Sequence, residues 1–220
     1  MDTITTMPAA NPIPRIGDSA PDFKAVTTQG PISFHEGAGK DWVVLFSHPA
    51  DFTPVCSTEL SEFARRAERF AKRGAKLIGL SIDSIHSHLA WRENLRSILD
   101  VSIDYPLIAD LDGSVARLYG MLHPGESATV TVRTVFVIDP KKMVRALIYY
   151  PLNVGRNMDE IERLLDALQT TERHSCATPV NWKLGDKVIV PPPKSVAEVA
   201  ERATHKEYER FDFYLNKKSI

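Results

Sequence analysis

The sequence is poor in cysteine, because its 220 residues include only Cys56 and Cys176, far apart along the chain. Two isolated cysteines exclude both a disulfide framework and a cysteine-rich zinc cluster. Any cysteine chemistry must therefore come from individually placed thiols.

The chain also lacks an excess of charge of either sign and has no long apolar run. Lysine and arginine number 27 against 28 aspartate and glutamate, a formal net charge of -1, so no positive field attracts nucleic acid or an anionic membrane. Met1–Asp18 has no apolar core long enough for a signal peptide, and no later run approaches a membrane span. These absences favour a soluble, cytoplasmic protein with no nucleic-acid or membrane partner.

Paired histidines are missing as well. His35, His86, His88 and His123 are scattered over different elements and lack the spacing of a zinc site. His86 and His88 are two residues apart, which on a helix points them in different directions. We expect surface or capping roles for these histidines and no metal site.

What the sequence does contain is the pattern of a packed α/β domain. Trp42–His48 and Ala75–Ile82 are short apolar runs typical of buried strands. Between them, apolar residues at helical spacing predict a helix over Ser57–Lys72, which Gly74 closes. A strand, helix and strand within about forty residues indicate a right-handed crossover onto a parallel sheet.

The elements that follow are predicted from the same periodicities. Thr134–Ile138 and Val144–Tyr150 are two strands, joined closely enough for an antiparallel hairpin. The pattern further predicts helices at Ile85–Leu99, Asp112–Tyr119 and Asn157–Leu168, and a short strand or extended loop at Tyr105–Ala109.

A change in composition marks a second region. From Ser175 onward the chain carries Thr178-Pro179, the run Pro191-Pro192-Pro193 and a charged tail with aromatic residues. We predict a main domain over residues 1–174 and a smaller extension over residues 175–220, or an arm that packs on a partner subunit.

The residues best suited to carry out a reaction lie in the connection Ser47–Cys56, which leads from a predicted strand into a helix. Cys56 is at the helix start, where unpaired backbone N–H groups and the positive end of the helix dipole favour a thiolate. A thioredoxin-type exchanger has Cys-x-x-Cys at this point, but Thr53 stands at the first position here. A lone thiolate beside a hydroxyl suits attack on an O–O bond.

The spacing Pro49-x-x-x-Thr53-x-x-Cys56 resembles the signature of peroxiredoxins, and the surrounding SHPADFTPVC resembles their one-cysteine, peroxiredoxin-6-like subgroup. The resemblance covers nearly the whole chain, through Ser81–Ser84, His88–Trp91, Arg133–Val137, Gly155–Asn157 and Ala177–Trp182. It implies a thioredoxin-like fold, with a mixed central sheet flanked by helices. It also implies a smaller C-terminal α+β extension that packs across a homodimer. Assembly of such dimers into higher oligomers is a further alternative.

The resemblance assigns roles residue by residue. Cys56 matches the peroxidatic cysteine, Thr53 the hydroxyl that orients the peroxide, and Pro49 the residue that shields the pocket. Arg133 matches the guanidinium that activates the thiolate, and His48 a histidine that lines the pocket entrance. The implied activity is thiol-dependent reduction of hydrogen peroxide and small organic hydroperoxides through a cysteine sulfenic acid, without metal, haem or flavin. Antioxidant defence and cell redox homeostasis are the implied process.

Structural roles remain open for several of these residues. Cys56 alone could be a small buried hydrophobe, Thr53 a helix cap and Pro49 a loop stiffener. Arg133 could be an ordinary charge at a strand end. Arg156 either belongs to a charge network behind the site or is a solvated loop residue.

Attack on a peroxide leaves Cys56 as a sulfenic acid, which must be returned to a thiol. Cys176 is the second thiol of the chain and could condense with this sulfenic acid to form a disulfide. The resemblance implies instead an external reductant, a small thiol or a redoxin, because one-cysteine members lack a resolving cysteine. We therefore interpret Cys176 as a structural thiol and keep resolution across a dimer as the alternative.

The same residues leave other functions open. A redox sensor or chaperone-like protein would use oxidation of Cys56 to change its assembly, and a thiol-disulfide exchanger would need the missing Cys-x-x-Cys. Some one-cysteine members are credited with a phospholipase activity that depends on Gly-x-Ser-x-Gly. The matching segment, Gly39–Val43, has Asp41 at the serine position, so we predict no lipase activity.

Overall fold

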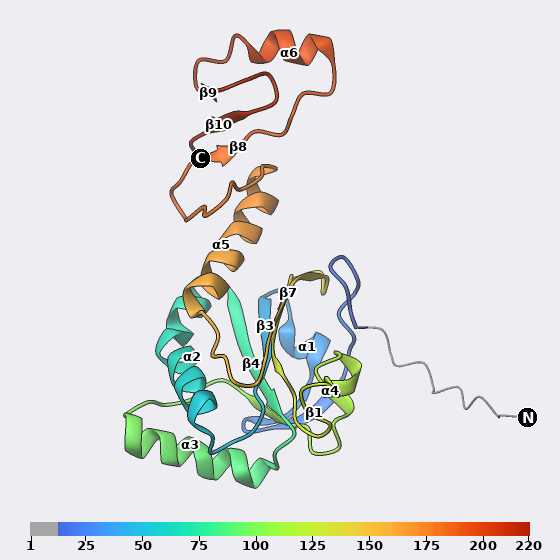
Figure 1. Ribbon diagram of the computed structural model, residues 1–220, viewed down its shortest axis with the longest axis vertical. Coiled ribbons are helices and arrows are strands. Elements are labelled where there is room, and N and C mark those ends of the chain that lie inside the picture. The colour runs from blue at the N-terminus through green and yellow to red at the C-terminus, as the bar shows by residue number, and fades with distance from the viewer. Residues whose placement is uncertain (1–12) are drawn as a thin grey trace, which may run out of the picture. The chain divides into compact units, whose positions relative to one another are not determined.

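The computed structural model describes residues 13–220, which divide into two compact units, the first ending at Arg156 and the second spanning Asn157–Ile220 (Figure 1). No helix among these residues is long and apolar enough to cross a membrane. The boundary expected from composition, between residues 174 and 175, stays a prediction.

The first unit is built on a mixed sheet of seven strands in the order β2-β1-β5-β4-β3-β6-β7. Strands β3, β4 and β5 are parallel, whereas β6 runs antiparallel to β3, and β7 antiparallel to β6. The strands are β1 (Lys24–Thr27), β2 (Gly30–Ser33), β3 (Trp42–Ser47), β4 (Ala75–Ser81), β5 (Leu107–Ala109), β6 (Arg133–Ile138) and β7 (Val144–Tyr150). The sequence predicts four of these, leaves β5 open as a short strand or an extended loop, and misses the short hairpin β1–β2.

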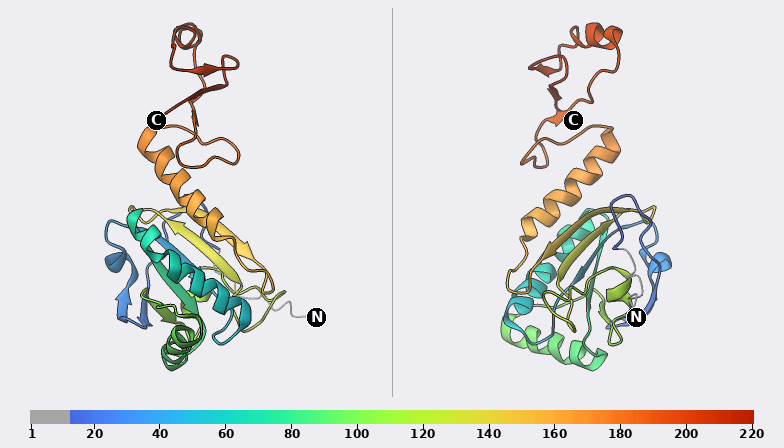
Figure 2. Two further views of the ribbon diagram at one scale, coloured as in Figure 1. Left: turned by 90° about the vertical axis from the view of Figure 1, so that its left-hand side faces the viewer. Right: turned by 45° about the vertical axis from the view of Figure 1, so that its right-hand side comes forward.

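Helices cover both faces of this sheet, with α2 and α3 on one side and α1 and α4 on the other (Figure 2). Phe46 of β3 stacks on Phe63 of α2, with 3.9 Å between ring centroids. Its neighbour Leu45 points to the opposite face, into the cluster that contains Phe34 of α1. The helices are α1 (Phe34–Ala38), α2 (Pro54–Lys72), α3 (Ile85–Leu99) and α4 (Ser114–Leu118).

Helix α2 begins three residues before the predicted start. Pro54 occupies its first turn, where a missing N–H and a fixed φ suit a helix start. Gly74, at φ 62°, follows the C-cap residue Arg73 and ends the helix as expected. The early start matters because it places Cys56 inside the first turn.

Helix α4 is shorter than the predicted range 112–119. Gly113, at φ 67°, is its N-cap, and the Asp112 carboxylate accepts a hydrogen bond from the Ser114 N–H. Asp112 and Gly113 thus form a turn that precedes the helix.

The second unit contains one long helix and a small sheet. Helix α5 extends to His174, well past the predicted end at Leu168. Trp182 and Val188 are buried with Ala167 in a small apolar cluster. The elements are α5 (Met158–His174), β8 (Val188–Ile189), α6 (Val196–Arg202), β9 (Glu209–Arg210) and β10 (Asn216–Lys218), with strand order β8-β10-β9.

Candidate active site

Cys56 lies in the first turn of α2, and its side chain has no exposed surface. Thr53 is the N-cap residue, with extended φ and ψ of -112° and 147°, and the first turn contains no acidic residue. The free N–H groups and the positive end of the 19-residue helix are therefore available to stabilise an anion at the sulfur.

Arg133, the first residue of β6, lies directly against this sulfur. Its Nη1 is 3.3 Å from Cys56 Sγ and donates to Glu59 Oε2 at 2.7 Å. Its Nε and Nη2 donate to the carbonyl oxygen of Leu152 at 3.0 and 2.6 Å. A guanidinium that stays charged and is fixed on three sides is well placed to stabilise a thiolate.

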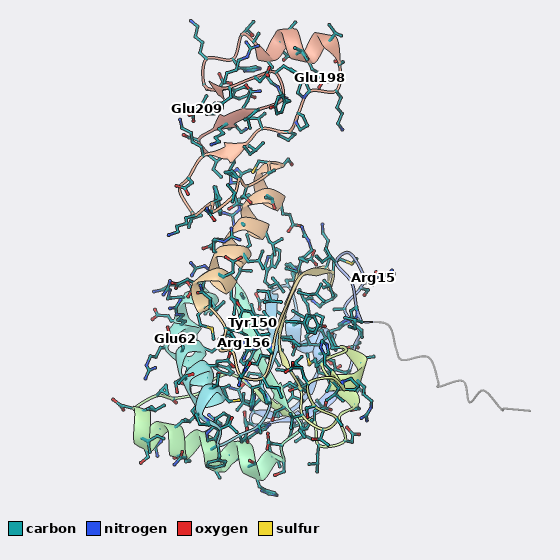
Figure 3. All side chains as sticks on the ribbon, viewed as in Figure 1. Arg15, Glu62, Tyr150, Arg156, Glu198 and Glu209 are labelled. Atoms are coloured by element: carbon teal, nitrogen blue, oxygen red, sulfur yellow. The ribbon has the colours of Figure 1, made fainter. Side chains whose placement is uncertain are left out.

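Glu59, one turn after Cys56 on α2, is bound by a second arginine. Arg156, labelled in Figure 3, donates to Glu59 Oε1 from its backbone N and Nε at 2.8 and 2.9 Å, and to Oε2 from Nη2 at 2.7 Å. Its Nη1 donates to the carbonyl oxygens of Ser47 and Thr134 at 2.9 and 2.7 Å. Of the two alternatives for Arg156, the charge network is therefore the one observed.

The charges of this cluster do not cancel without the sulfur. Burial alone would raise the pKa of the Glu59 carboxyl, but the charge of Arg156, its hydrogen bonds and the charge of Arg133 hold that pKa below its usual range. One carboxylate therefore faces two guanidinium groups. The sulfur of Cys56 lies beside Arg133, where a second negative charge would balance the cluster.

Thr53 does not cap the helix with its side chain, since no such hydrogen bond is present. Its hydroxyl donates instead to the carbonyl oxygen of Ala50 at 2.8 Å. With its hydrogen engaged, the hydroxyl oxygen keeps lone pairs that can accept a hydrogen bond from an incoming O–H group. Pro49, at the other end of the same loop, is buried.

Phe52, which lies between Pro49 and Thr53 in the loop, has an unusual backbone conformation. Its φ of 54° is left-handed, which is strained for a bulky side chain. The ring is 57% exposed and lies 6.1 Å from the ring of Trp91. The loop before α2 therefore carries local strain.

His48 and His88 meet at a shared carboxylate, which contradicts the expectation that His88 has a surface or capping role. His48 Nε2 lies 2.9 Å from Asp51 Oδ1, and His88 Nδ1 lies 2.8 Å from Asp51 Oδ2. All three side chains are buried. Spacing along the chain does not reveal this arrangement, because the two rings come together from α3 and from the loop before α2.

The ligand atoms of these three side chains lie within 4.8 Å of one another, close enough to hold a metal ion. Their hydrogen bonds account for the arrangement without one. Burial lowers the pKa of His48, which favours its neutral form. Burial would raise the pKa of Asp51, but the hydrogen bonds from His48 and His88 keep it well below its usual range.

Cys176 belongs to the second unit and is partly buried against its apolar cluster. Its Sγ lies 3.9 Å from the carbonyl oxygen of Thr170. Burial raises the pKa of the Cys176 thiol. This environment disfavours a thiolate, the form that attacks a sulfenic acid.

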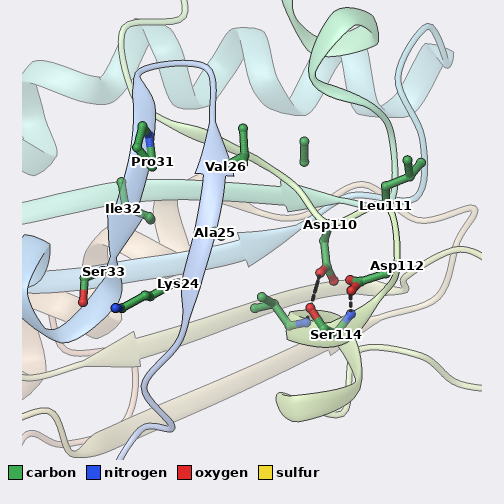
Figure 4. A pocket seen from close by; sticks show the side chains of 12 residues that line it. Lys24, Ala25, Val26, Pro31, Ile32, Ser33, Asp110, Leu111, Asp112 and Ser114 are labelled. Carbon is green, nitrogen blue, oxygen red and sulfur yellow. Dashed lines mark hydrogen bonds between the residues drawn. The ribbon is translucent and has the colours of Figure 1, made fainter.

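A surface pocket of about 700 Å³ lies between β1, β2 and the start of α4 (Figure 4). Within it, Asp110 accepts hydrogen bonds from the backbone N–H groups of Val115 and Ala116 at 3.0 and 2.7 Å. None of the residues singled out for cysteine chemistry lines this pocket.

Comparison with known families gives a consistent result. Residues 16–147 match the AhpC/TSA family, and residues 167–206 match the C-terminal domain of 1-Cys peroxiredoxin. A protein named peroxiredoxin from Aquifex aeolicus is 49% identical over 218 residues, covering 94% of this chain and 98% of that protein. Peroxiredoxin 2 from Caldanaerobacter subterraneus is 50% identical over 209 residues, covering 94% of each.

Solved structures show the same similarity in three dimensions. A yeast mitochondrial 1-Cys peroxiredoxin, studied for thiol resolution via glutathione and thioredoxin systems, superposes with a TM-score of 0.85 at 43% identity, covering 94% of this chain and 99% of that one. A cysteine-to-serine mutant of peroxiredoxin 6 from Arenicola marina gives 0.85 at 38% identity, covering 93% and 97%. The fold is therefore the thioredoxin-like fold expected from the sequence, with the C-terminal extension.

Proposed function

The chain belongs to the peroxiredoxin family, in its one-cysteine branch, and is thus a thiol-dependent peroxidase; we propose that Cys56 is its attacking thiolate. The observation that carries this assignment is the 3.3 Å contact between Arg133 Nη1 and the buried sulfur. The first turn of a long helix and the surplus guanidinium charge support it.

In the proposed reaction, the thiolate of Cys56 attacks one oxygen of the hydroperoxide. An S–O bond forms as the O–O bond breaks, so the sulfur is oxidised to a sulfenic acid and the peroxide is reduced. The other oxygen leaves with the bonding pair and takes up a proton as water or an alcohol. Arg133 reaches the sulfur throughout and is positioned to stabilise charge that spreads onto the oxygens.

Thr53 and Pro49 complete the pocket in this proposal. The Thr53 oxygen accepts the peroxide O–H, because its own hydrogen is engaged with Ala50. Pro49, buried beside His48, keeps water away from the reacting atoms. Hydrogen peroxide and small organic hydroperoxides are the proposed substrates.

An external thiol, small or carried by a redoxin, is the proposed reductant. It displaces water from the sulfenic acid to give a mixed disulfide, and a second thiol releases the reduced enzyme. The raised pKa of Cys176 supports a structural rather than a resolving role for that thiol.

A homodimer and a cytoplasmic location are further parts of the proposal. In the C-terminal unit, Phe211, Phe213 and Tyr214 are each about half exposed, as expected for a surface that a second subunit covers. Both cysteines are free, which fits a reducing compartment.

Trapping the sulfenic acid tests the assignment. The reduced protein receives one equivalent of hydrogen peroxide with dimedone present, and intact mass and peptide mapping locate the adduct. We expect the adduct on Cys56 in the wild type and in Cys176→Ser, and none in Cys56→Ser. A Cys56 that stays a free thiol while peroxide persists would overturn the proposal.

A further inference from the structure

The buried array formed by His48, Asp51 and His88 has a hydrogen-bonding pattern that fixes its protons. Both ring nitrogens of His88 face oxygen atoms: Nδ1 lies 2.8 Å from Asp51 Oδ2, and Nε2 lies 3.1 Å from the carbonyl oxygen of Ile108. A neutral imidazole has a single N–H and can donate to only one of them. Both contacts are hydrogen bonds only when the ring of His88 is a positively charged imidazolium.

Asp51 determines the state of the other ring. Its carboxylate is ionised, accepts from His88 through Oδ2 and has no proton to donate. His48 Nε2, 2.9 Å from Oδ1, must therefore be the donor of that hydrogen bond. The ring of His48 is neutral with its proton on Nε2, and its lone pair is on Nδ1.

Nδ1 of His48 is buried and has no hydrogen-bond partner in the described part of the chain. The backbone of His48 is held in place, since its backbone N–H donates to the Leu80 carbonyl oxygen at 2.9 Å and its carbonyl oxygen accepts from the Thr131 hydroxyl at 2.8 Å. A buried acceptor without a partner is unfavourable, so this nitrogen is suited to accept a hydrogen bond from an O–H group that reaches it.

The surroundings of the array support this distribution of protons. Asp83 is the other charged group near His48; its carboxylate already accepts from the Asp51 N–H at 3.0 Å and the Ser81 hydroxyl at 2.6 Å. The uncharged ring of Trp91 also lies near His48, with 5.3 Å between the two ring centroids. Among the described residues, His88 is the ring whose positive charge lies hydrogen-bonded to Asp51.

We propose that Asp51 and His88 are positioning residues whose buried ion pair holds His48 in the Nε2–H tautomer, leaving Nδ1 as an acceptor for the O–H group of a hydroperoxide. The inference rests on the proposed function and adds two residues to it. Asp51 and His88 act on the reaction only through the tautomer of His48.

The protonation pattern is tested directly by nitrogen NMR of the imidazole rings in the reduced full-length protein at neutral pH. We expect two protonated nitrogens for His88, and one protonated and one unprotonated nitrogen for His48, the latter being Nδ1. Signals are assigned by their loss in His88→Gln and His48→Asn. An unprotonated nitrogen in His88, or a proton on Nδ1 of His48, would overturn the proposal.

Asp51→Asn tests the effect on the reaction. The amide turns one acceptor into a donor and no longer fixes the tautomer of His48. We expect the second-order rate constant for peroxide oxidation of Cys56 to fall at least about tenfold, as when a catalytic histidine is left in the wrong tautomer. Asp110→Asn is the matched control, because Asp110 is also buried and hydrogen-bonded but holds α4; its rate should not change.

His88→Gln separates positioning from mere structural support. Gln can still donate to Asp51, but the carboxylate loses its counter-charge and draws a second proton onto His48, which blocks Nδ1. We expect a loss of rate that is larger at pH 6 than at pH 8. An equal loss at both values, or an unchanged rate in a folded Asp51→Asn, would overturn the proposal. The spectrum of the wild type tests the array even if peroxide failed to oxidise Cys56.

Discussion

Glu59 and Arg156 are joined by three hydrogen bonds of 2.7 to 2.9 Å, which use the backbone N–H, Nε and Nη2 of the arginine. Arg156 thereby fixes the carboxylate that in turn accepts a bond from Arg133. The guanidinium that contacts Cys56 is thus oriented by a buried network that spans α2, the ends of β3 and β6, and the loop after β7.

Glu59→Gln should damage both stability and activity. The amide places an N–H group against a guanidinium donor and leaves two buried positive charges without their carboxylate. Breaking a buried ion pair in this way costs about 3–5 kcal/mol of unfolding free energy, and we expect peroxide reduction to fall with the misplacement of Arg133. Urea unfolding and stopped-flow kinetics measure the two effects.

Glu62→Gln is the matched control for that variant. Glu62 lies on the same helix and pairs with Arg66 at 2.6 Å, but its side chain is 36% exposed, against 3% for Glu59. A surface pair of this kind contributes about 0–1 kcal/mol. Equal losses in Glu59→Gln and Glu62→Gln would contradict the importance of the buried network.

Arg133→Lys should lower the rate of Cys56 oxidation even though the positive charge is kept. An ammonium group cannot reach Leu152, Glu59 and the sulfur together as the planar guanidinium does. We expect a loss of about 10²–10³-fold, the range seen when a preorganised donor is removed, and a larger loss in Arg133→Gln. Thiolate absorbance should decrease in the same order. Wild-type rates in Arg133→Lys would refute the assignment.

Thr53→Ser and Thr53→Val separate the hydroxyl from the shape of the side chain. Serine keeps the oxygen that the structure leaves free to accept a hydrogen bond, whereas valine keeps only the volume. We expect Thr53→Ser to retain most of kcat/KM for hydrogen peroxide and Thr53→Val to lose about tenfold or more. Similar values for both would mean that the hydroxyl does not contact substrate.

Cys176→Ser should leave peroxide turnover with an external thiol unchanged. The wild-type thiol is partly buried, and its raised pKa lowers the fraction present as the reactive thiolate. Non-reducing peptide maps of the oxidised wild type should lack a Cys56–Cys176 disulfide. Loss of turnover in the variant, or such a disulfide, would identify Cys176 as a resolving cysteine.

Acid should destabilise the protein through Glu59. Its pKa is lowered on folding from an ordinary value of 4.5, so its contribution to stability is fully present above about pH 4.5 and is lost as the pH falls through the folded pKa. We expect the unfolding free energy of the wild type to fall more steeply than that of Glu59→Gln between about pH 5 and pH 3. Parallel curves for the two proteins would contradict this sign.

The loop residues of the site could be predicted from the sequence because they are contiguous. Thr53 and Cys56 belong to one motif at a helix start, and the helix dipole gives a local reason for a thiolate. Arg133 came only from family resemblance, since at the beginning of an apolar strand it looks like any terminal charge. Its contact with the sulfur depends on the pairing of β6 with β3.

The buried charges could not be predicted in the same way. Glu59 stands among the charged residues of an amphipathic helix, and only its position three residues after Cys56 indicates the same face. His88 is three residues before Trp91 and seven before Leu95, the other two buried residues of α3. That apolar spacing was a usable signal, but the partner of His88 is distant in sequence and is found only in the folded chain.

In the proposed reaction, the complete burial of Cys56 makes the oxidation and the reduction of its sulfur sterically unequal. A hydroperoxide is small, but a reducing thiol must bring a carbon chain or a whole protein to the same sulfur. We therefore expect that approach to involve an opening of the strained segment at Phe52 and of the first turn of α2. The reductive rate should therefore level off as the thiol concentration rises, at a ceiling set by how often the chain opens rather than by which thiol is supplied.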